Sequence, residues 1–318
     1  MWVILLVLCC FAGVTAYYKY FYAPHRTLVL DFEKKNYNSS YYETVLISND
    51  LCVSEDEHEA EYEPNTKRLK AAGLFDVSSA ETIYAHNIHK KLYPASTTKI
   101  LTALIAIKHC NMDDIVTISK NASADSFAWD EATCGLEKGD KISLENLLYG
   151  LLLCSGNDTA VAIAEHISGS VDEFAELMNA QANELMATNS HFMNPSGLYH
   201  SDHYTTAYDL YLIFNECIKQ PEFVKIISAA KHTAEIESAD GTMRKEKWIP
   251  TNFYATEKVK SPDDVTVIGG KTGTLEVAGN CLIIMAEDKE NNPYISVVMG
   301  SDTKKVLYQD MNKMMKGI

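Results

Sequence analysis

The sequence has no C-x-x-C pair, although it contains eight cysteines. Cys9 and Cys10 are adjacent within an apolar N-terminal run and the others are scattered, which argues against a zinc knuckle or a thioredoxin-like motif. Buried free thiols are the simplest expectation, and disulfides between distant cysteines stay open. Because no acidic cluster matches a metal-ligand pattern either, we expect neither a metal nor an organic cofactor.

Positive charge is also scarce. Lysine and arginine number 28 against 43 aspartates and glutamates, which gives a formal net charge of -15. A phosphate backbone would be repelled over most of such a surface, so nucleic-acid binding is excluded as a function.

No apolar run reaches the roughly 20 residues that a membrane-spanning helix usually needs. The run from Trp2 to Ala16 is shorter, and a tyrosine-rich patch follows it, as at a membrane interface. Residues 1–23 are therefore predicted to be a signal peptide or an N-terminal membrane anchor, with Val14-Thr15-Ala16 as a possible cleavage site. Lys19 and Arg26 follow the run rather than precede it, so charge alone does not give the orientation.

Residues 24–66 are polar, tyrosine-rich and acidic, which is typical of a solvated, poorly ordered spacer, and we assign them no chemistry. A main domain is predicted over residues 67–318, because the chain of 318 residues with 47% hydrophobic content can bury one sizeable core.

Local patterns place this domain in the α/β (α+β) class. Alternating apolar runs predict a hairpin over 71–77 and 81–87, a strand over 114–119, and strands over 266–274, 281–288 and 294–300. Helical spacing predicts helices from near Ser96, over 143–153, 158–167, 173–187 and 206–218, and at the end over 305–316. Strands from both ends of the domain indicate one antiparallel sheet flanked by helices, with a helical subdomain inserted between them. The active site is expected where sheet and insertion meet.

Ser96-Thr97-Thr98-Lys99 is an S-x-x-K tetrad at the start of a predicted helix. Its serine and lysine project from one helix face, so a lysine made neutral by burial and by a nearby cation can take the serine proton. The tetrad alone is weak, since Ser228–Lys231 and Ser301–Lys304 also match it, without the preceding Pro-Ala turn and the long apolar helix.

Ser155-Gly156-Asn157 lies between two apolar helices, where a hydroxyl and an amide can relay a proton and hold a substrate backbone. Taken by itself, Ser155 is better explained as a helix N-cap. Ser119-Lys120-Asn121 has the same S-x-N spacing but directly follows a strand.

Lys271-Thr272-Gly273-Thr274 is the most informative motif, because K-T-G occurs once in the chain, inside a strand. Lys271 and Thr272 on a strand edge can bind a substrate carboxylate, and Gly273 lets a peptide approach closely. The alternative is an ordinary edge strand protected by a lysine.

In the order S-x-x-K, S-x-N, K-T-G, the chain resembles the penicillin-recognising serine enzymes. Over residues 71–300, "PASTTKILTALIA", "CSGNDTAVAIAEHISGS", "NPSGL" and "GGKTGT" resemble the D-alanyl-D-alanine carboxypeptidases of peptidase family S11. The resemblance implies a β-lactamase/transpeptidase-like fold, with Ser96 as nucleophile, Lys99 as its base and Ser155 with Asn157 in proton relay. It also implies a carboxylate site at Lys271 and Thr272, and an oxyanion hole made by the N–H groups of Ser96 and Thr274.

The resemblance implies an extracytoplasmic enzyme, in the cell wall or on the outer face of the membrane. Its substrate would be a stem peptide ending in D-Ala-D-Ala, with β-lactams as covalent inhibitors and the membrane contacted through an uncleaved N-terminal segment. The short segment after K-T-G leaves no room for a C-terminal β-rich domain.

A D,D-endopeptidase and an idle penicillin-binding sensor remain alternatives. A β-lactamase is disfavoured because no E-x-x-L-N loop follows Asn157.

Overall fold

The computed structural model describes residues 51–318, so the predicted signal or anchor segment 1–23 and residues 24–50 of the predicted spacer lie outside the described residues. Leu51–Ile318 form one compact unit. Among the described residues, no helix is both long enough and apolar enough to cross a membrane.

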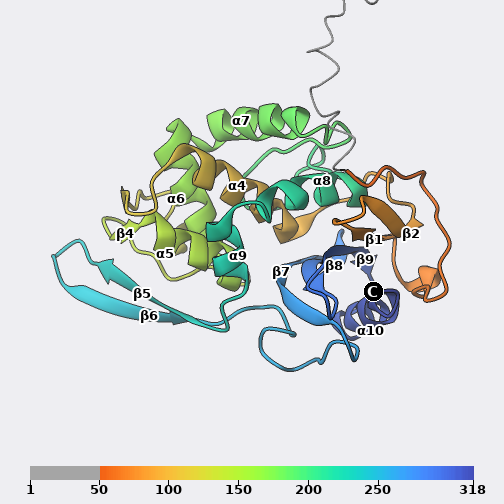
Figure 1. Ribbon diagram of the computed structural model, residues 1–318. Helices are drawn as coiled ribbons and strands as arrows, with labels where there is room; N and C mark the ends of the chain where they lie inside the picture. The colour runs from red at the N-terminus through yellow and green to blue at the C-terminus, as the bar shows by residue number, and fades with distance from the viewer. Residues whose placement is uncertain (1–50) are drawn as a thin grey trace, which may run out of the picture. The chain divides into compact units, whose positions relative to one another are not determined.

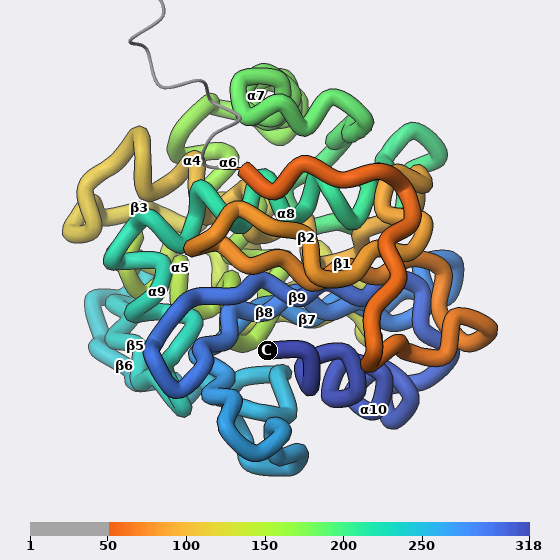
Figure 2. Tube along the Cα trace, turned by 45° about the vertical axis from the view of Figure 1, so that its right-hand side comes forward, coloured from red at the N-terminus to blue at the C-terminus, as the bar shows by residue number. Residues whose placement is uncertain are grey.

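An antiparallel sheet of five strands forms the centre of the unit, in the order β2-β1-β9-β8-β7 (Figures 1 and 2). Its strands are β1 (Ala71–Asp76), β2 (Glu81–His86), β7 (Thr266–Leu275), β8 (Gly279–Glu287) and β9 (Pro293–Ser301). The predicted hairpin and the sheet built from both ends of the domain are confirmed, since β1 pairs with β2 on one side and with β9 on the other.

Helices cover both faces of this sheet. Helix α10 (Lys304–Met315) packs on one face, and α8 (Ala207–Cys217) lies on the other (Figure 2). Side chains alternate along each strand, so Leu282 and Ile284 of β8 join the cluster with α10, whereas Ile283 joins the cluster with the other helices. Burial on both faces explains why these strands appear in the sequence as continuous apolar runs.

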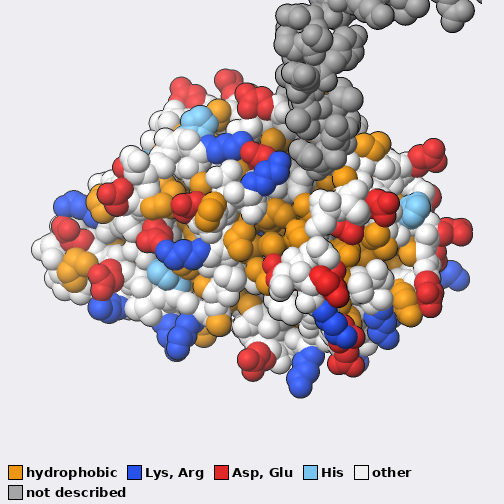
Figure 3. Space-filling model, in the orientation of Figure 1, with side chains coloured by type: hydrophobic (Ala, Val, Ile, Leu, Met, Phe, Trp, Pro, Cys, Tyr) orange, Lys and Arg blue, Asp and Glu red, His pale blue; other side chains and the backbone are white. Residues whose placement is uncertain are grey.

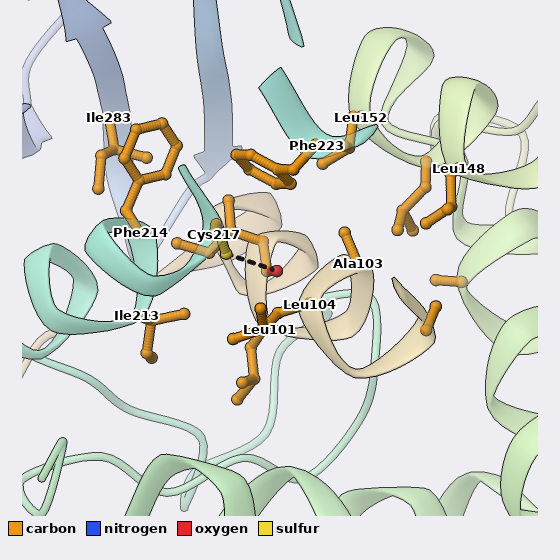
Figure 4. Close-up of a cluster of buried hydrophobic side chains, with 14 of the residues drawn as sticks. Leu101, Ala103, Leu104, Leu148, Leu152, Ile213, Phe214, Cys217, Phe223 and Ile283 are labelled. Atoms are coloured by element: carbon orange, nitrogen blue, oxygen red, sulfur yellow. Dashed lines mark hydrogen bonds between the residues drawn. The ribbon is translucent and has the colours of Figure 1, made fainter. Parts of the chain in front are cut away.

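The inserted subdomain is helical, as predicted. It consists of α4 (Lys99–His109), α5 (Leu144–Tyr149), the π-helical η6 (Gly150–Cys154), α6 (Asn157–Ser168), α7 (Val171–Glu184), α8 and α9 (Pro221–Ile227). Short 3-10 turns complete the unit: η3 (Thr66–Arg68), η4 (Ala95–Thr98) and η5 (Ala124–Ser126). Helix α4 runs through the core, where Leu101 and Leu104 lie near Phe214 of α8 (Figure 4). The Cys217 thiol of α8 links the two helices by donating a hydrogen bond to the Ile100 carbonyl oxygen of α4 at 3.5 Å.

A second sheet of four strands borders the insertion and was largely missed from the sequence. It has the order β3-β4-β5-β6, with β3 (Ile115–Thr117), β4 (Lys141–Ser143), β5 (His232–Glu237) and β6 (Met243–Trp248). Of these, only β3 was predicted. The sheet is tied to the insertion by His232, whose ring stacks on Tyr149 at 3.7 Å between centroids.

The predicted spacer is wrong for residues 51–66, which pack on the domain. Cys52 is fully buried and its N–H donates to the Tyr211 hydroxyl at 2.8 Å. Further along, His58 pairs with Ala85, and the N–H of Asn65 donates to Asp310 at 3.1 Å. The compact unit therefore begins at Leu51 rather than at residue 67.

The described cysteines are all free thiols. On the face shown in Figure 3, basic side chains stand singly or in small groups among acidic ones, with apolar side chains between them. That face offers no continuous basic surface to a polyanion.

Candidate active site

The turn that carries Ser96 is held in an unusual backbone conformation. Ala95, the residue before Ser96, has a φ of 49°, in the left-handed region that residues other than glycine rarely adopt. The loop around Gly197 supports this turn from below, because a Cβ added at Gly197 would lie 1.9 Å from the Ala95 carbonyl oxygen. Close backbone packing therefore fixes the position of Ser96.

Lys99 begins α4 one helical turn after Ser96, and its side chain is fully buried. Its Nζ lies 3.0 Å from the Ser96 hydroxyl oxygen, 2.8 Å from Asn157 Oδ1 and 2.7 Å from the Ser196 carbonyl oxygen. Asn157 Oδ1 and the carbonyl oxygen only accept hydrogen bonds. A neutral Lys99 amine donates its two N–H groups to these two oxygens, and its lone pair can then accept the hydroxyl proton of Ser96.

The electrostatic environment favours this neutral form. Burial lowers the pKa of Lys99 well below its usual value, and the positive charge of Lys271 lowers it further. Lys99 is thus prepared to accept a proton from the hydroxyl beside it.

The loop Ser155-Gly156-Asn157 separates η6 from α6. Ser155 ends η6 with a φ of 63°, whereas Gly156 occupies the N-cap of α6. The N-cap explanation for Ser155 is therefore wrong. Asp158 anchors the loop from inside, since its carboxylate accepts the N–H groups of Cys134 at 2.7 Å and Thr159 at 2.8 Å.

Strand β7 brings the K-T-G segment to the same place. Lys271 is fully buried, and its Nζ donates to the Ser155 hydroxyl at 2.9 Å and to the Thr272 carbonyl at 2.8 Å. Burial lowers the pKa of Lys271 to about 7. Gly273 lies against the nucleophile turn, where an added Cβ would meet the Pro94 oxygen at 2.9 Å and the Ser96 nitrogen at 3.1 Å.

These elements surround a cleft of about 520 Å³. Among the predicted residues, those that line it are Ser96, Ser155, Asn157, Thr272, Gly273 and Thr274. Lys99 and Lys271 lie behind this lining, each bonded to a serine of the cleft. Every site residue predicted from the sequence therefore belongs to one cleft, between the sheet and the insertion.

Two contributors to the site were missed. The carbonyl oxygen of Ser196 binds Lys99, and the Thr251 hydroxyl lies 2.6 Å from that of Thr272. Ser196 lies in the Asn194–Leu198 segment, to which the sequence assigns no catalytic side chain, and a backbone carbonyl has no side-chain signal in a sequence. Thr251 lies outside the three motifs, so nothing in its spacing marked it.

Two serines from the other S-x-x-K and S-x-N matches form hydrogen bonds only with nearby backbone groups. The hydroxyl of Ser228 donates to the Lys225 carbonyl, and that of Ser119 accepts the N–H of Ala122. His203 is a hydrogen-bonded loop residue, with its Nε2 2.9 Å from the Thr98 hydroxyl oxygen. Burial lowers the pKa of His203 to about 4, so this imidazole is neutral.

The family model of the S11 peptidases, the D-alanyl-D-alanine carboxypeptidases, matches residues 58–303. The chain belongs to this family. As an S11 peptidase it is 33% identical over 255 residues to the D-alanyl-D-alanine carboxypeptidase DacF of Bacillus subtilis, covering 77% of this chain and 61% of that one. It spans about three fifths of the length of the first of these curated relatives.

Solved structures of S11-like proteins share the fold. The Streptomyces K15 D,D-transpeptidase superposes with a TM-score of 0.74 at 28% identity, over 80% of this chain and 98% of that one. Penicillin-binding protein 5 of Haemophilus influenzae gives 0.70 at 32% identity, over 78% and 70% of the two chains. The predicted transpeptidase-like α/β fold is confirmed.

Proposed function

We propose that this S11 peptidase is a serine-type D-Ala-D-Ala carboxypeptidase that removes the terminal D-alanine of peptidoglycan stem peptides through an acyl-enzyme on Ser96. The observation that carries the proposal is the buried Lys99 amine, 3.0 Å from the Ser96 hydroxyl and bonded elsewhere only to acceptors. Such an amine is a general base already in place.

In the acylation step, the Ser96 oxygen attacks the carbonyl carbon of the penultimate D-alanine while Lys99 takes the hydroxyl proton. The developing oxyanion is stabilised by the N–H groups of Ser96 and Thr274, and this assignment is supported by the presence of both residues in the lining of the cleft. The peptide C–N bond then breaks, and Ser96 carries the acyl group as an ester.

Lys271 and Ser155 serve the departing D-alanine. Thr272 and the Lys271 charge behind it bind the terminal carboxylate, which defines the substrate as a peptide with a free C-terminus. The Ser155 hydroxyl, bonded to Lys271 at 2.9 Å, relays to the leaving amine the proton that Lys99 took from Ser96, which returns Lys99 to its neutral form. A water molecule activated by Lys99 then hydrolyses the ester and regenerates the hydroxyl of Ser96.

β-Lactams fit the same scheme as covalent inhibitors, because their strained amide acylates Ser96 and keeps the leaving amine attached. The segment after Asn157 lacks the E-x-x-L-N glutamate that a β-lactamase of the S-D-N type uses for deacylation. We therefore expect a long-lived penicilloyl ester. The substrate places the enzyme outside the cytoplasm, with the N-terminal segment as export signal or membrane tether.

D,D-transpeptidation is the second candidate, since a structural relative bears that name. The two reactions share acylation and differ only in whether water or an amine accepts the acyl group. Product analysis separates them, because hydrolysis yields a shortened stem and transfer yields a cross-link.

The test is covalent labelling of the full chain with fluorescent penicillin, followed by release of D-alanine from a pentapeptide stem. We expect Ser96→Ala to abolish both, and Ser228→Ala, which removes the serine of another S-x-x-K match, to preserve both. Labelling that survives in Ser96→Ala overturns the nucleophile. Labelling of the wild type without D-alanine release, but with cleavage of cross-linked dimers, makes the enzyme an endopeptidase.

A further inference from the structure

Cys110, Asp114 and His166 bring three different metal-ligand types to one place, well separated in the sequence from the catalytic motifs. Their ligand atoms, the thiol sulfur, a carboxylate oxygen and an imidazole nitrogen, all lie within 4.8 Å of one another. Within residues 51–318 this is the only group of three or more such side chains that meets that distance.

The three ligand atoms are close enough to one another that a small movement of the side chains would bring them to tetrahedral coordination. Zinc binds sulfur at about 2.3 Å and imidazole nitrogen or carboxylate oxygen at about 2.0–2.2 Å, so two ligands of one ion stand roughly 3.3–3.7 Å apart. The side chains must close by up to about 1.5 Å. Cys110 and Asp114 are partly exposed and His166 is exposed, so their rotamers can make this movement.

The surroundings of these three side chains favour the binding of a cation. Cys110 is the C-cap of α4, and His166 lies in the last turn of α6, so the negative ends of two helix dipoles converge there. Asp114 is already oriented, because its carboxylate accepts the backbone N–H of Asn111 at 2.9 Å. The neighbouring cation Lys108 is engaged by Glu216 at 3.0 Å.

We propose that Cys110, Asp114 and His166 bind one divalent transition-metal ion, zinc being the best match, with water as the fourth ligand. On binding, the Cys110 thiol gives its proton to solvent and coordinates as thiolate. The chemistry of the ligands is mixed sulfur, nitrogen and oxygen, which favours zinc over magnesium or calcium.

The position of the site gives it a structural consequence. Helix α4 begins with Lys99 and ends at Cys110, and α6 begins with Asn157 and ends shortly after His166. The two helices pack together and Lys99 bonds Asn157 at their starts. A metal at their far ends would clamp the pair and hold that arrangement rigid.

The experiment measures zinc binding to the metal-free full chain by equilibrium dialysis, with cobalt(II) as a spectroscopic substitute. We expect one zinc per chain, a thiolate-to-cobalt charge-transfer band, and a rise in Tm of about 5 °C at a zinc concentration of roughly 100 times Kd. His166→Ala and Cys110→Ser should each weaken binding by at least about tenfold.

His109→Ala and Asp113→Asn are the matched controls, since each removes the same type of side chain next to the group without touching it. They should bind zinc as the wild type does. Because His166 is exposed, its variant is expected to fold, and circular dichroism verifies this. Absence of stoichiometric zinc, a cobalt spectrum without the thiolate band, or unchanged binding in His166→Ala overturns the proposal, whatever the outcome of the penicillin assay.

Discussion

At the scale of single residues, the cleft depends on two buried lysines that must hold different charges. Both pKa values are lowered by burial, and the charge of Lys271 lowers that of Lys99 further. The second proton is thus disfavoured once the first is bound. In the mechanism proposed above, Lys271 carries the charge that pairs with a substrate carboxylate, and Lys99 stays neutral to act as base.

This assignment predicts a bell-shaped pH profile for the acylation of Ser96. The second-order rate constant for penicillin labelling should rise with pH as Lys99 loses its proton, and fall again as pH passes about 7, where Lys271 becomes neutral in the free enzyme. Measured in Lys271→Arg, the falling limb should move to higher pH, because a guanidinium stays protonated. An unmoved falling limb in that variant would show that another group causes it.

How much of the site the sequence could predict is clear from the partners of Lys99. Ser96 and Asn157 belong to motifs with fixed spacing, so their meeting with Lys99 was predictable. The third partner is the backbone carbonyl of Ser196, and every residue has a carbonyl. Only the folded path of the 194–198 loop brings this one to the amine.

At the scale of elements, the nucleophile turn and the loop at Gly197 form one unit. Gly197 has a φ of 82°, and its missing Cβ leaves room for the Ala95 carbonyl. Gly241, in the β5–β6 turn, has a φ of 84° but nothing within 4 Å of its Cβ position. Gly197 thus combines a left-handed backbone with a close contact at its Cβ position, whereas Gly241 has the left-handed backbone alone.

Gly197→Ala is therefore predicted to lower the rate of penicillin acylation by about 100-fold, the order of effect of a 1 Å displacement at a reacting group. Gly241→Ala should cost only about 1 kcal/mol in the free energy of unfolding, for its left-handed backbone, and leave acylation unchanged. Stopped-flow labelling and urea unfolding measure the two quantities. Equal acylation rates in the two variants would contradict the supporting role of the Gly197 loop.

Most elements predicted from the sequence were long enough to show a period, and β3 (Ile115–Thr117) is the exception. Helices α4, α6 and α8 and strands β7 to β9 fulfil that condition, and all were found. β4 covers only Lys141–Ser143, and its pairing with β5 depends on contacts far along the chain. The β5–β6 hairpin did carry a readable turn, Asp240-Gly241, between two alternating segments.

At the scale of the whole molecule, the sheet separates stability from catalysis. The cleft lies between the insertion and β7, and of α10 only the first residue, Lys304, lines it. The rest of α10 covers the other face of the sheet with side chains such as Met311, which is fully buried. Removing contacts beneath α10 weakens the domain without reaching Ser96.

Met311→Ala is accordingly expected to lower the free energy of unfolding by about 2–5 kcal/mol, the usual range for emptying a buried methionine site. Met243, which is 60% exposed on β6, is the matched control, and Met243→Ala should change stability by less than about 0.5 kcal/mol. Urea unfolding gives both values. Penicillin acylation of the folded Met311→Ala protein should match the wild type, and a large loss would mean that the two faces are coupled.

The strand order also determines when this domain can complete its fold during synthesis. Within the five-stranded sheet, the first hairpin joins the other strands only through β9, which is synthesised some two hundred residues after β2. A nascent chain therefore carries its nucleophile for most of translation with no finished cleft around it. Closing a contact of such long range is intrinsically slow, so the five-stranded sheet and the cleft beside it can form only after β9 has been synthesised.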